Sequence, residues 1–171
     1  MRGLFVGRFQ PFHNGHLKAV EYALKKCDEL IIMVGSSQKC FQFEDPFTVG
    51  ERIEMIHETL KARGIRDRCL ILSVPDIMNN ALWVAHVNSL VPRYEVVYSN
   101  NPLTIKLFKD AGKKSEKIPF FDRHKNEGTK IRESMVKNSE WKKLVPPSVV
   151  KFSGEVGVVQ RLKDIANNCK H

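Results

Sequence analysis

Short apolar runs alternate with helical patterns along this chain, and the alternation limits the folds that it can adopt. Runs typical of buried strands are predicted at residues 2–6, 29–35, 69–74 and 94–99. After the first run, Leu17, Val20 and Leu24 are spaced three and four apart, which places them on one face of a helix. Strands that alternate with helices predict a parallel sheet with right-handed crossovers and helices on both faces. We therefore expect an α/β fold with a doubly wound parallel sheet.

Local signals place the other elements. Thr48 followed by Glu51 is typical of a capping box at a helix start, and Gly64 is typical of a helix end. A short helix, a fifth strand at the sheet edge and a C-terminal helical segment are expected at residues 104–111, at about 116–120 and from about 146. The sequence has no internal repeat and no low-complexity linker, so we expect a single domain over residues 1–171.

The composition is that of an ordinary globular domain. The chain has 171 residues, of which 42% are hydrophobic and 27% charged, and it is long enough for a real core. No apolar run approaches the ~20 residues of a membrane span, and the N-terminus lacks a signal-peptide pattern. Four scattered cysteines form no CxxC pair and no zinc-like spacing, which indicates a reducing compartment and no metal centre. We expect a cytoplasmic protein without a membrane partner.

The net charge of +9 indicates an anionic partner. The charge is uneven, since residues 106–143 carry twelve basic and six acidic side chains. A nucleic acid, a small phosphate-rich ligand and solvated helix faces are all compatible with this surplus. RNA-binding signatures are not visible in the sequence, which makes a nucleic acid the less favoured partner.

The segment after the first strand, Gly-Arg-Phe-Gln-Pro-Phe-His-Asn-Gly-His at residues 7–16, is typical of a phosphate site. His13 and His16 lie where the loop becomes a helix, and Gly15 between them has no Cβ to block a ligand from the backbone. The free N–H groups of the first helical turn favour an anion there. Ligands are expected at the carboxyl end of such a strand. The alternatives to a phosphate site are that His13 and His16 form half of a metal site or are simply two surface histidines.

Polar residues also follow the second and third strands. Ser36 can bond a ligand or belong to a plain turn. After the third strand come Asp76, Asn80 and Trp83, and the indole can stack on a ligand ring or belong to the core. No GxGxxG follows the first strand and no GxxxxGK[ST] occurs, so dinucleotide-dependent oxidoreductases and P-loop proteins lack their phosphate-binding device here.

A later segment, Gly128-Thr129-Lys130-Ile131-Arg132, opens another predicted helix. Thr129 can cap that helix, and Arg132 lies about one turn further on. An arginine at this position can make paired charge-assisted bonds to a triphosphate. A capped basic surface helix is the alternative.

These motifs resemble those of a known family. His13-Asn14-Gly15-His16 resembles the HxGH signature of the nucleotidyltransferase superfamily, and Glu127-Gly128-Thr129 with Arg132 is similar to a shortened form of its second signature, ISSTxxR. The longer string at residues 7–16 is similar to that of archaeal-type nicotinamide-nucleotide adenylyltransferases. The resemblance covers the chain from residue 2 to about residue 162. It implies a Rossmann-like fold and a homo-oligomer such as a hexamer.

The resemblance also implies a reaction, in which ATP and nicotinamide mononucleotide (NMN) give NAD and pyrophosphate by direct in-line attack, with Mg²⁺ carried on ATP. The catalytic side chains that it implies are Arg8, His13 and His16. The ATP-binding residues that it implies are His13, Gly15, His16, Gly128, Thr129 and Arg132. The NMN-binding residues that it implies are Arg8, Ser36, Asp76, Asn80 and Trp83, with the indole stacked on the pyridinium ring.

Two positions depart from the family pattern. Some archaeal-type members carry an arginine that meets the nucleotide phosphate where Glu44 stands here, and Lys39 or Arg52 are the candidates to replace it. Asn100 stands where the family has a glycine in its SGNP turn, and asparagine is well able to adopt a positive φ.

Two other functions compete with this interpretation. One is an adenylyl- or cytidylyltransferase that acts on pantetheine phosphate, FMN or a polyol phosphate, which would share the histidines but differ at Trp83. The other is a non-catalytic RNA- or nucleotide-binding module that uses the +9 charge. The sequence leaves open whether nicotinic acid mononucleotide is also used, how large the oligomer is and which metal is preferred.

Overall fold

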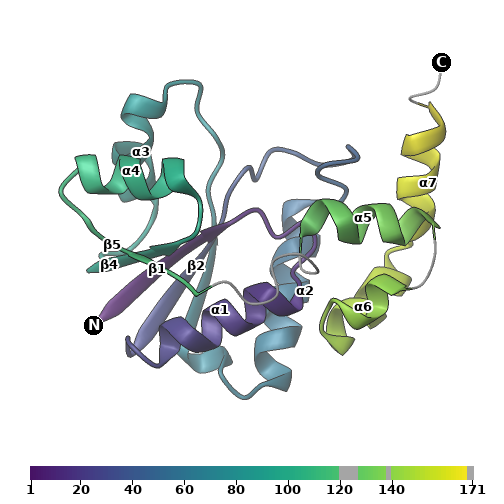
Figure 1. Cartoon of the computed structure of the whole chain (residues 1–171), viewed down its shortest axis with the longest axis horizontal. Coiled ribbons are helices and arrows are strands. Elements are labelled where there is room, and N and C mark those ends of the chain that lie inside the picture. Colours follow the sequence, from purple (N-terminus) through teal and green to yellow (C-terminus); the bar gives the residue numbers. More distant parts are fainter. Residues whose placement is uncertain (120–126, 138–139, 169–171) are drawn as a thin grey trace.

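The computed structural model describes residues 1–119, 127–137 and 140–168. In this part of the chain five strands form one parallel sheet with the order β3-β2-β1-β4-β5. The strands are β1 Arg2–Gly7, β2 Glu29–Val34, β3 Cys69–Ser73, β4 Val96–Ser99 and β5 Lys114–Lys117. The chain starts at the central strand, builds one side of the sheet and then returns to build the other (Figure 1). The predicted doubly wound parallel sheet is confirmed.

Helices cover both faces of this sheet. The helices are α1 Asn14–Leu24, α2 Val49–Ala62, α3 Trp83–Leu90, α4 Pro102–Asp110, α5 Gly128–Lys137, α6 Pro147–Glu155 and α7 Val158–Asn168. Alternate residues of β2 enter two different cores, with Leu30 and Ile32 on the side of α1 and α2, and Ile31 and Met33 on the side of α3 and α4. The three C-terminal helices extend the first core, with α6 against α2 and α5 against α7 (Figure 1).

Several helix ends have clear local causes. Thr48 and Glu51 form the expected reciprocal capping box of α2, and Gly64 follows that helix with a φ of +67°. The fourth helix begins at Pro102, two residues earlier than expected, because the Asn101 side chain caps it by accepting hydrogen bonds from the N–H groups of Leu103 and Thr104. The C-terminal segment consists of two helices, α6 and α7.

The edge strand lies earlier than predicted. It covers Lys114–Lys117 rather than residues 116–120, because it is a polar strand whose pairing with β4 leaves no apolar signature. Beyond it, the Ile118 N–H donates to the Asn100 side chain at 3.1 Å instead of continuing the ladder. Asn100 does not adopt a positive φ, so that expectation is wrong. Phe120, the expected end of the strand, lies outside the described residues.

None of the described helices combines the length and the apolar character that a membrane crossing requires.

The end of β1 is built around an aromatic residue in an unusual conformation. Phe9 has a φ of +54° and is 1% exposed, so its ring folds back beneath the loop. A Cβ placed on Gly7 would lie 2.6 Å from that ring, far inside van der Waals contact. Glycine at position 7 therefore allows the buried Phe9 ring to approach the backbone of β1.

We expect Gly7→Ala to destabilise the protein by about 1–3 kcal/mol, the range for overpacking a core. Gly154→Ala is the matched control, because a Cβ there meets nothing within 4 Å and the residue lies inside α6. Alanine should be neutral or slightly stabilising at that helical position. Urea unfolding of both variants measures the difference, and equal stability would contradict the proposed steric role of Gly7.

Candidate active site

The two histidines of the first loop cap helix α1 reciprocally. His13 is the N-cap residue, and its Nδ1 accepts a hydrogen bond from the His16 N–H at 3.2 Å. The His13 N–H in turn donates to His16 Nδ1, also at 3.2 Å. The two rings stack with centroids 3.5 Å apart. Each ring is therefore fixed in place by the backbone of the other residue.

This geometry sets the protonation state of both rings. A neutral imidazole whose Nδ1 accepts a hydrogen bond carries its proton on Nε2. Burial lowers the pKa of His13 from 6.5 to about 4. The pKa of His16 is also well below its usual value, because of burial and then because of the neighbouring His13. At neutral pH the pair therefore offers two uncharged Nε2–H donors at the N-terminus of a helix.

Aromatic side chains hold the His16 ring in place. The Phe9 ring meets it edge-on at 4.9 Å, and the Phe12 ring stacks on it at 5.5 Å. Both phenylalanines are almost completely buried. The positive φ of Phe9 therefore has a structural consequence, because it directs the Phe9 ring against the His16 imidazole.

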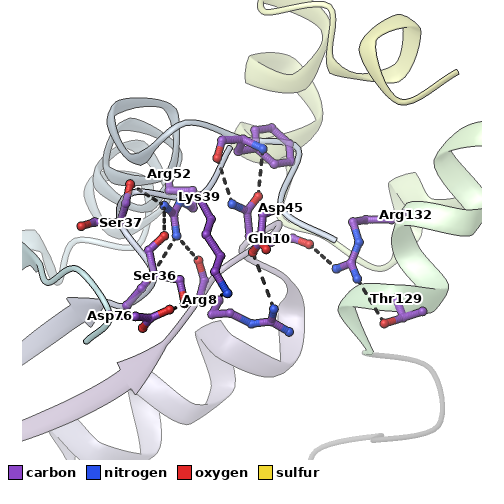
Figure 2. Close-up of polar contacts among 12 residues, drawn as sticks. Arg8, Gln10, Ser36, Ser37, Lys39, Asp45, Arg52, Asp76, Thr129 and Arg132 are labelled. Carbon is purple, nitrogen blue, oxygen red and sulfur yellow. Dashed lines mark hydrogen bonds and ion pairs between the residues drawn. The ribbon is translucent and has the colours of Figure 1, made fainter. Parts of the chain in front are cut away.

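The buried guanidinium of Arg52 ties the loop after β1 to the loop after β2. Arg52 donates to the backbone carbonyls of Arg8, Gly35, Ser36, Ser37 and Thr48 at 2.9–3.4 Å (Figure 2). The residue is 0% exposed, and burial lowers its pKa. Because its donors are used on carbonyls, Arg52 is not available to replace the phosphate-binding arginine expected at position 44. Lys39 remains the candidate, since its side chain is 44% exposed and pairs with Asp76 at 3.7 Å.

Gln10 links the first loop to the segment before α2. Its side-chain amide donates to the Phe47 carbonyl and accepts from the Phe47 N–H, both at 2.9 Å. The Gln10 carbonyl accepts a bond of 2.8 Å from Arg132 Nη1 (Figure 2). Helix α5 is thereby joined to the histidine loop.

Arg132 is more deeply buried than a surface phosphate ligand would be. It is 4% exposed, and its Nη2 donates to the Thr129 hydroxyl at 3.1 Å. Its Nε has no hydrogen-bond partner among the described residues. Thr129 is the second residue of α5 rather than its cap, because the helix already begins at Gly128. A side chain on Gly128 would come within 2.9 Å of the Arg132 guanidinium.

Arg8 leaves the first loop toward solvent and pairs with a buried carboxylate. Its side chain is 55% exposed, and its Nη1 lies 3.6 Å from Asp45 Oδ1. The Asp45 side chain is only 3% exposed. Sequence reasoning did not single out Asp45, because an acidic residue in a polar loop has no signature of burial.

The predicted acceptor-binding residues fall into two groups. Asp76, Asn80 and Trp83 line one pocket of about 310 Å³ together with Asn101 and Thr104, between the loops after β3 and β4. Ser36 does not line this pocket; it is 6% exposed, with a φ of +50° and its carbonyl bound to Arg52.

Trp83 packs on the core and also lines the pocket. Its ring meets Phe108 edge-on at 5.4 Å, so it packs on the core between the sheet and α4. It is nevertheless only partly buried and lines the pocket. Gly15 is the second residue of α1, between His13 and His16 in the chain. The ligand roles of all these residues remain predictions.

The low histidine pKa values make stability depend on pH. We expect the free energy of unfolding to fall as the pH decreases from about 6.5 to about 4, because unfolded histidines with a pKa of 6.5 then bind protons that the folded rings do not. Above pH 6.5 both states are neutral, so the full stability is present there. Urea unfolding at several pH values measures the slope.

Variants separate the histidine pair from other acid effects. His13→Asn keeps a cap acceptor that does not titrate, so the stability should fall less steeply with pH. His57→Gln is the control, because the His57 side chain is 40% exposed and lies on α2, outside the histidine cap of α1. The same slope in His13→Asn as in the parent would show that the cap does not cause the pH dependence.

Sequence comparison identifies relatives over nearly the whole chain. Residues 4–139 match the sequence model of the Cytidylyltransferase-like family. The chain is 45% identical over 170 residues to a nicotinamide-nucleotide adenylyltransferase from Saccharolobus solfataricus, with 99% of both chains covered. It is 46% identical over 170 residues to a nicotinamide-nucleotide adenylyltransferase from Archaeoglobus fulgidus, covering 97% of this chain and 98% of that one.

Structure comparison agrees with this fold. A crystal structure of a bifunctional NMN adenylyltransferase/ADP ribose pyrophosphatase from Francisella tularensis superposes with a TM-score of 0.75 at 22% identity. The match covers 98% of this chain but 53% of the Francisella chain, so this chain spans about half of that protein. The strand order, the histidine loop and the identity of 45–46% over nearly the whole chain all indicate the same family. The chain belongs to the cytidylyltransferase-like family and, within it, to the nicotinamide-nucleotide adenylyltransferases.

Proposed function

We propose that this chain transfers the adenylyl group of ATP to nicotinamide mononucleotide, which yields NAD and pyrophosphate. The names of relatives that are 45% and 46% identical over nearly their full length support the substrates. The observation that carries the chemistry is the pair of imidazoles held through Nδ1, because it provides two fixed N–H donors at a helix N-terminus.

The reaction needs alignment and charge stabilisation rather than a general base. The phosphate oxygen of NMN attacks the α-phosphorus of ATP, a new P–O bond forms, and the bond to the β-phosphate breaks to release pyrophosphate. A phosphate is already a competent nucleophile. The enzyme therefore has to hold two polyanions in line and stabilise the charge that builds on the phosphoryl oxygens.

The proposed roles follow from burial and charge. His16 and His13 would donate Nε2–H bonds to the reacting phosphate, and the exposed guanidinium of Arg8 would lie beside the two phosphoryl groups. Arg132 would hold the β- and γ-phosphates through its Nε, to which no described residue is hydrogen-bonded. Gly15, Gly128 and Thr129 would bring helix N–H groups to the triphosphate.

The pocket of about 310 Å³ suits the acceptor. We assign the pyridinium ring to the face of Trp83, because a cationic ring is attracted to an indole. Asn80 can both donate to and accept from the carboxamide, with Asp76 nearby. Ser36 does not line this pocket, and we propose that it contacts the same ligand from outside the lining.

Mg²⁺ would arrive on the triphosphate. Within residues 1–119, 127–137 and 140–168, no group of three His, Cys, Asp or Glu side chains could hold a metal. Two carboxylates near the proposed site are already paired, Asp45 with Arg8 and Asp76 with Lys39. Such a donor set suits a metal that keeps most of its waters and is held by phosphates.

A cytoplasmic location and a homo-oligomer, such as a hexamer, are further parts of this proposal.

An acceptor panel tests the function. The protein is mixed with ATP, Mg²⁺ and one of NMN, nicotinic acid mononucleotide, pantetheine phosphate, FMN or a polyol phosphate, and pyrophosphate release is followed. We expect release with NMN and formation of NAD. Release only with another acceptor would favour the related transferases. Salt-dependent RNA binding without any pyrophosphate would favour a nucleic-acid-binding module.

We expect His16→Ala to lower kcat by about 10²–10³, the range for the loss of one preorganised donor. The KM for ATP should change far less. Because His16 also accepts a bond in the helix cap, the thermal midpoint of the variant has to be measured on the same samples. A folded variant whose kcat lies within a few-fold of the parent would remove His16 from the mechanism.

We expect Trp83→Ala to raise the KM for NMN roughly three- to thirty-fold, because a cation on an indole face contributes about 0.5–2 kcal/mol. The KM for ATP should change little, and Trp83→Phe should fall between. Phe108→Leu is the matched control, since it removes the edge contact of Trp83 without altering the pocket lining. A stable Trp83→Ala protein with an unchanged KM for NMN would contradict the nicotinamide assignment.

A further inference from the structure

Arg8, Arg52 and Arg132 all lie within electrostatic range of the buried Asp45 carboxylate in the proposed phosphate site. Arg52 and Arg132 are almost completely buried, and burial lowers the pKa of each. The nearby Arg8 lowers both pKa values further, whereas Asp45 raises them. Asp45 thus lies within electrostatic reach of three guanidinium groups that repel one another.

The backbone that carries Asp45 is fixed on both sides. Gln42 and Asp45 exchange backbone hydrogen bonds of 3.3 and 3.2 Å, which closes a tight turn before the acid. After it, the Pro46 carbonyl accepts a bond of 2.8 Å from Arg161 of α7, and Phe47 is paired with the Gln10 side chain. The carboxylate therefore has little freedom to follow a moving partner.

One oxygen of the Asp45 carboxylate, Oδ1, is buried without a hydrogen bond from the described residues. Arg8 Nη1 lies 3.6 Å from this oxygen, which makes an ion pair but is too long for a hydrogen bond (Figure 2). A buried charge of this kind is costly unless it is paired. Arg8 is thus the partner that makes the burial of Asp45 tolerable.

Arg52 and Arg132 cannot replace Arg8 as the ion-pair partner of Asp45. Arg52 uses its donors on loop carbonyls, and Arg132 uses both Nη groups on Gln10 and Thr129. Arg8 is the one of the three whose side chain is more than half exposed, so a ligand from solvent can reach its guanidinium. Its Nη1 is directed to Asp45 at 3.6 Å.

We propose that Asp45 is a positioning residue of the adenylyl transfer, which holds the Arg8 guanidinium at the reacting phosphates and keeps it from being repelled by Arg52 and Arg132. This inference rests on the proposed function, because it assigns Arg8 to the reacting phosphates. Asp45 does not touch the substrates, so its loss acts through Arg8. Removal of its charge also leaves the site more positive, and the affinity for ATP is therefore retained.

The first test is a split between kcat and KM. Asp45→Asn should lower kcat for NAD formation about tenfold, the scale for a misplaced contact group, while the KM for ATP changes less than about threefold. The control is Asp110→Asn, which breaks an exposed ion pair of 2.7 Å with Lys106 on α4 and should leave both constants unchanged. An unchanged kcat in folded Asp45→Asn would overturn the proposal.

The second test asks whether Asp45 acts through Arg8. In an Arg8→Ala background, Asp45→Asn should change kcat by less than about twofold, because the group that it positions is gone. The same tenfold loss in both backgrounds would show that Asp45 supports the fold instead, and would overturn the proposal. Thermal midpoints of all four proteins accompany the cycle.

A third measurement needs no activity. In the ligand-free protein, ¹⁵N NMR should show separate signals for the two Nη groups of Arg8, assigned with Arg8→Lys, because the ion pair restrains the guanidinium. The signals should merge in Asp45→Asn as rotation becomes free. Merged signals in the parent protein would overturn the proposal. A parent protein that forms no NAD but keeps separate signals would instead reject the proposed function.

Discussion

The hydrogen bonds of the buried Arg52 guanidinium are the interaction on which the site depends. A guanidinium provides five donors and no acceptor, so it can be buried only where several oxygen atoms converge. Here they are carbonyl oxygens at the ends of β1 and β2 and at the start of α2. The loop backbones have unusual conformations, with positive φ at Phe9 and Ser36, and they need such a fixed partner. One side chain thereby sets the positions of two loops that carry proposed ligand contacts.

A second network brings the C-terminal helices into the same unit. Arg132 from α5 binds the Gln10 carbonyl, and Arg161 from α7 binds both the Pro46 carbonyl and the Glu51 carboxylate. Glu51 in turn completes the capping box of α2 with Thr48. The helices after the sheet therefore belong to the same structural unit, because they hold the loops that surround the histidine pair.

Much of the fold could be predicted from the sequence, because apolar periodicity is strong where strands and helices are buried. The central strands were predicted for that reason, and the capping box of α2 was predicted from the local spacing of Thr48 and Glu51. The edge strand Lys114–Lys117 was misplaced because it is polar and is identified only by its pairing with β4. The placement of His13 and His16 at the start of α1 was predictable because it follows from a local motif. The buried contacts of Arg52 and Asp45 were not predictable, since they form between segments that look like ordinary polar sequence.

The neutral histidine pair also determines how the site responds to its surroundings. Because burial keeps both imidazoles uncharged near neutrality, their contribution to the site's electric field does not vary as the pH fluctuates around 7. The fixed positive charge comes instead from guanidinium groups, which stay protonated throughout the physiological range. Attraction of a polyanion into this site is therefore governed by the mobile ions of the medium, which screen charges over about 8–10 Å, rather than by the concentration of protons.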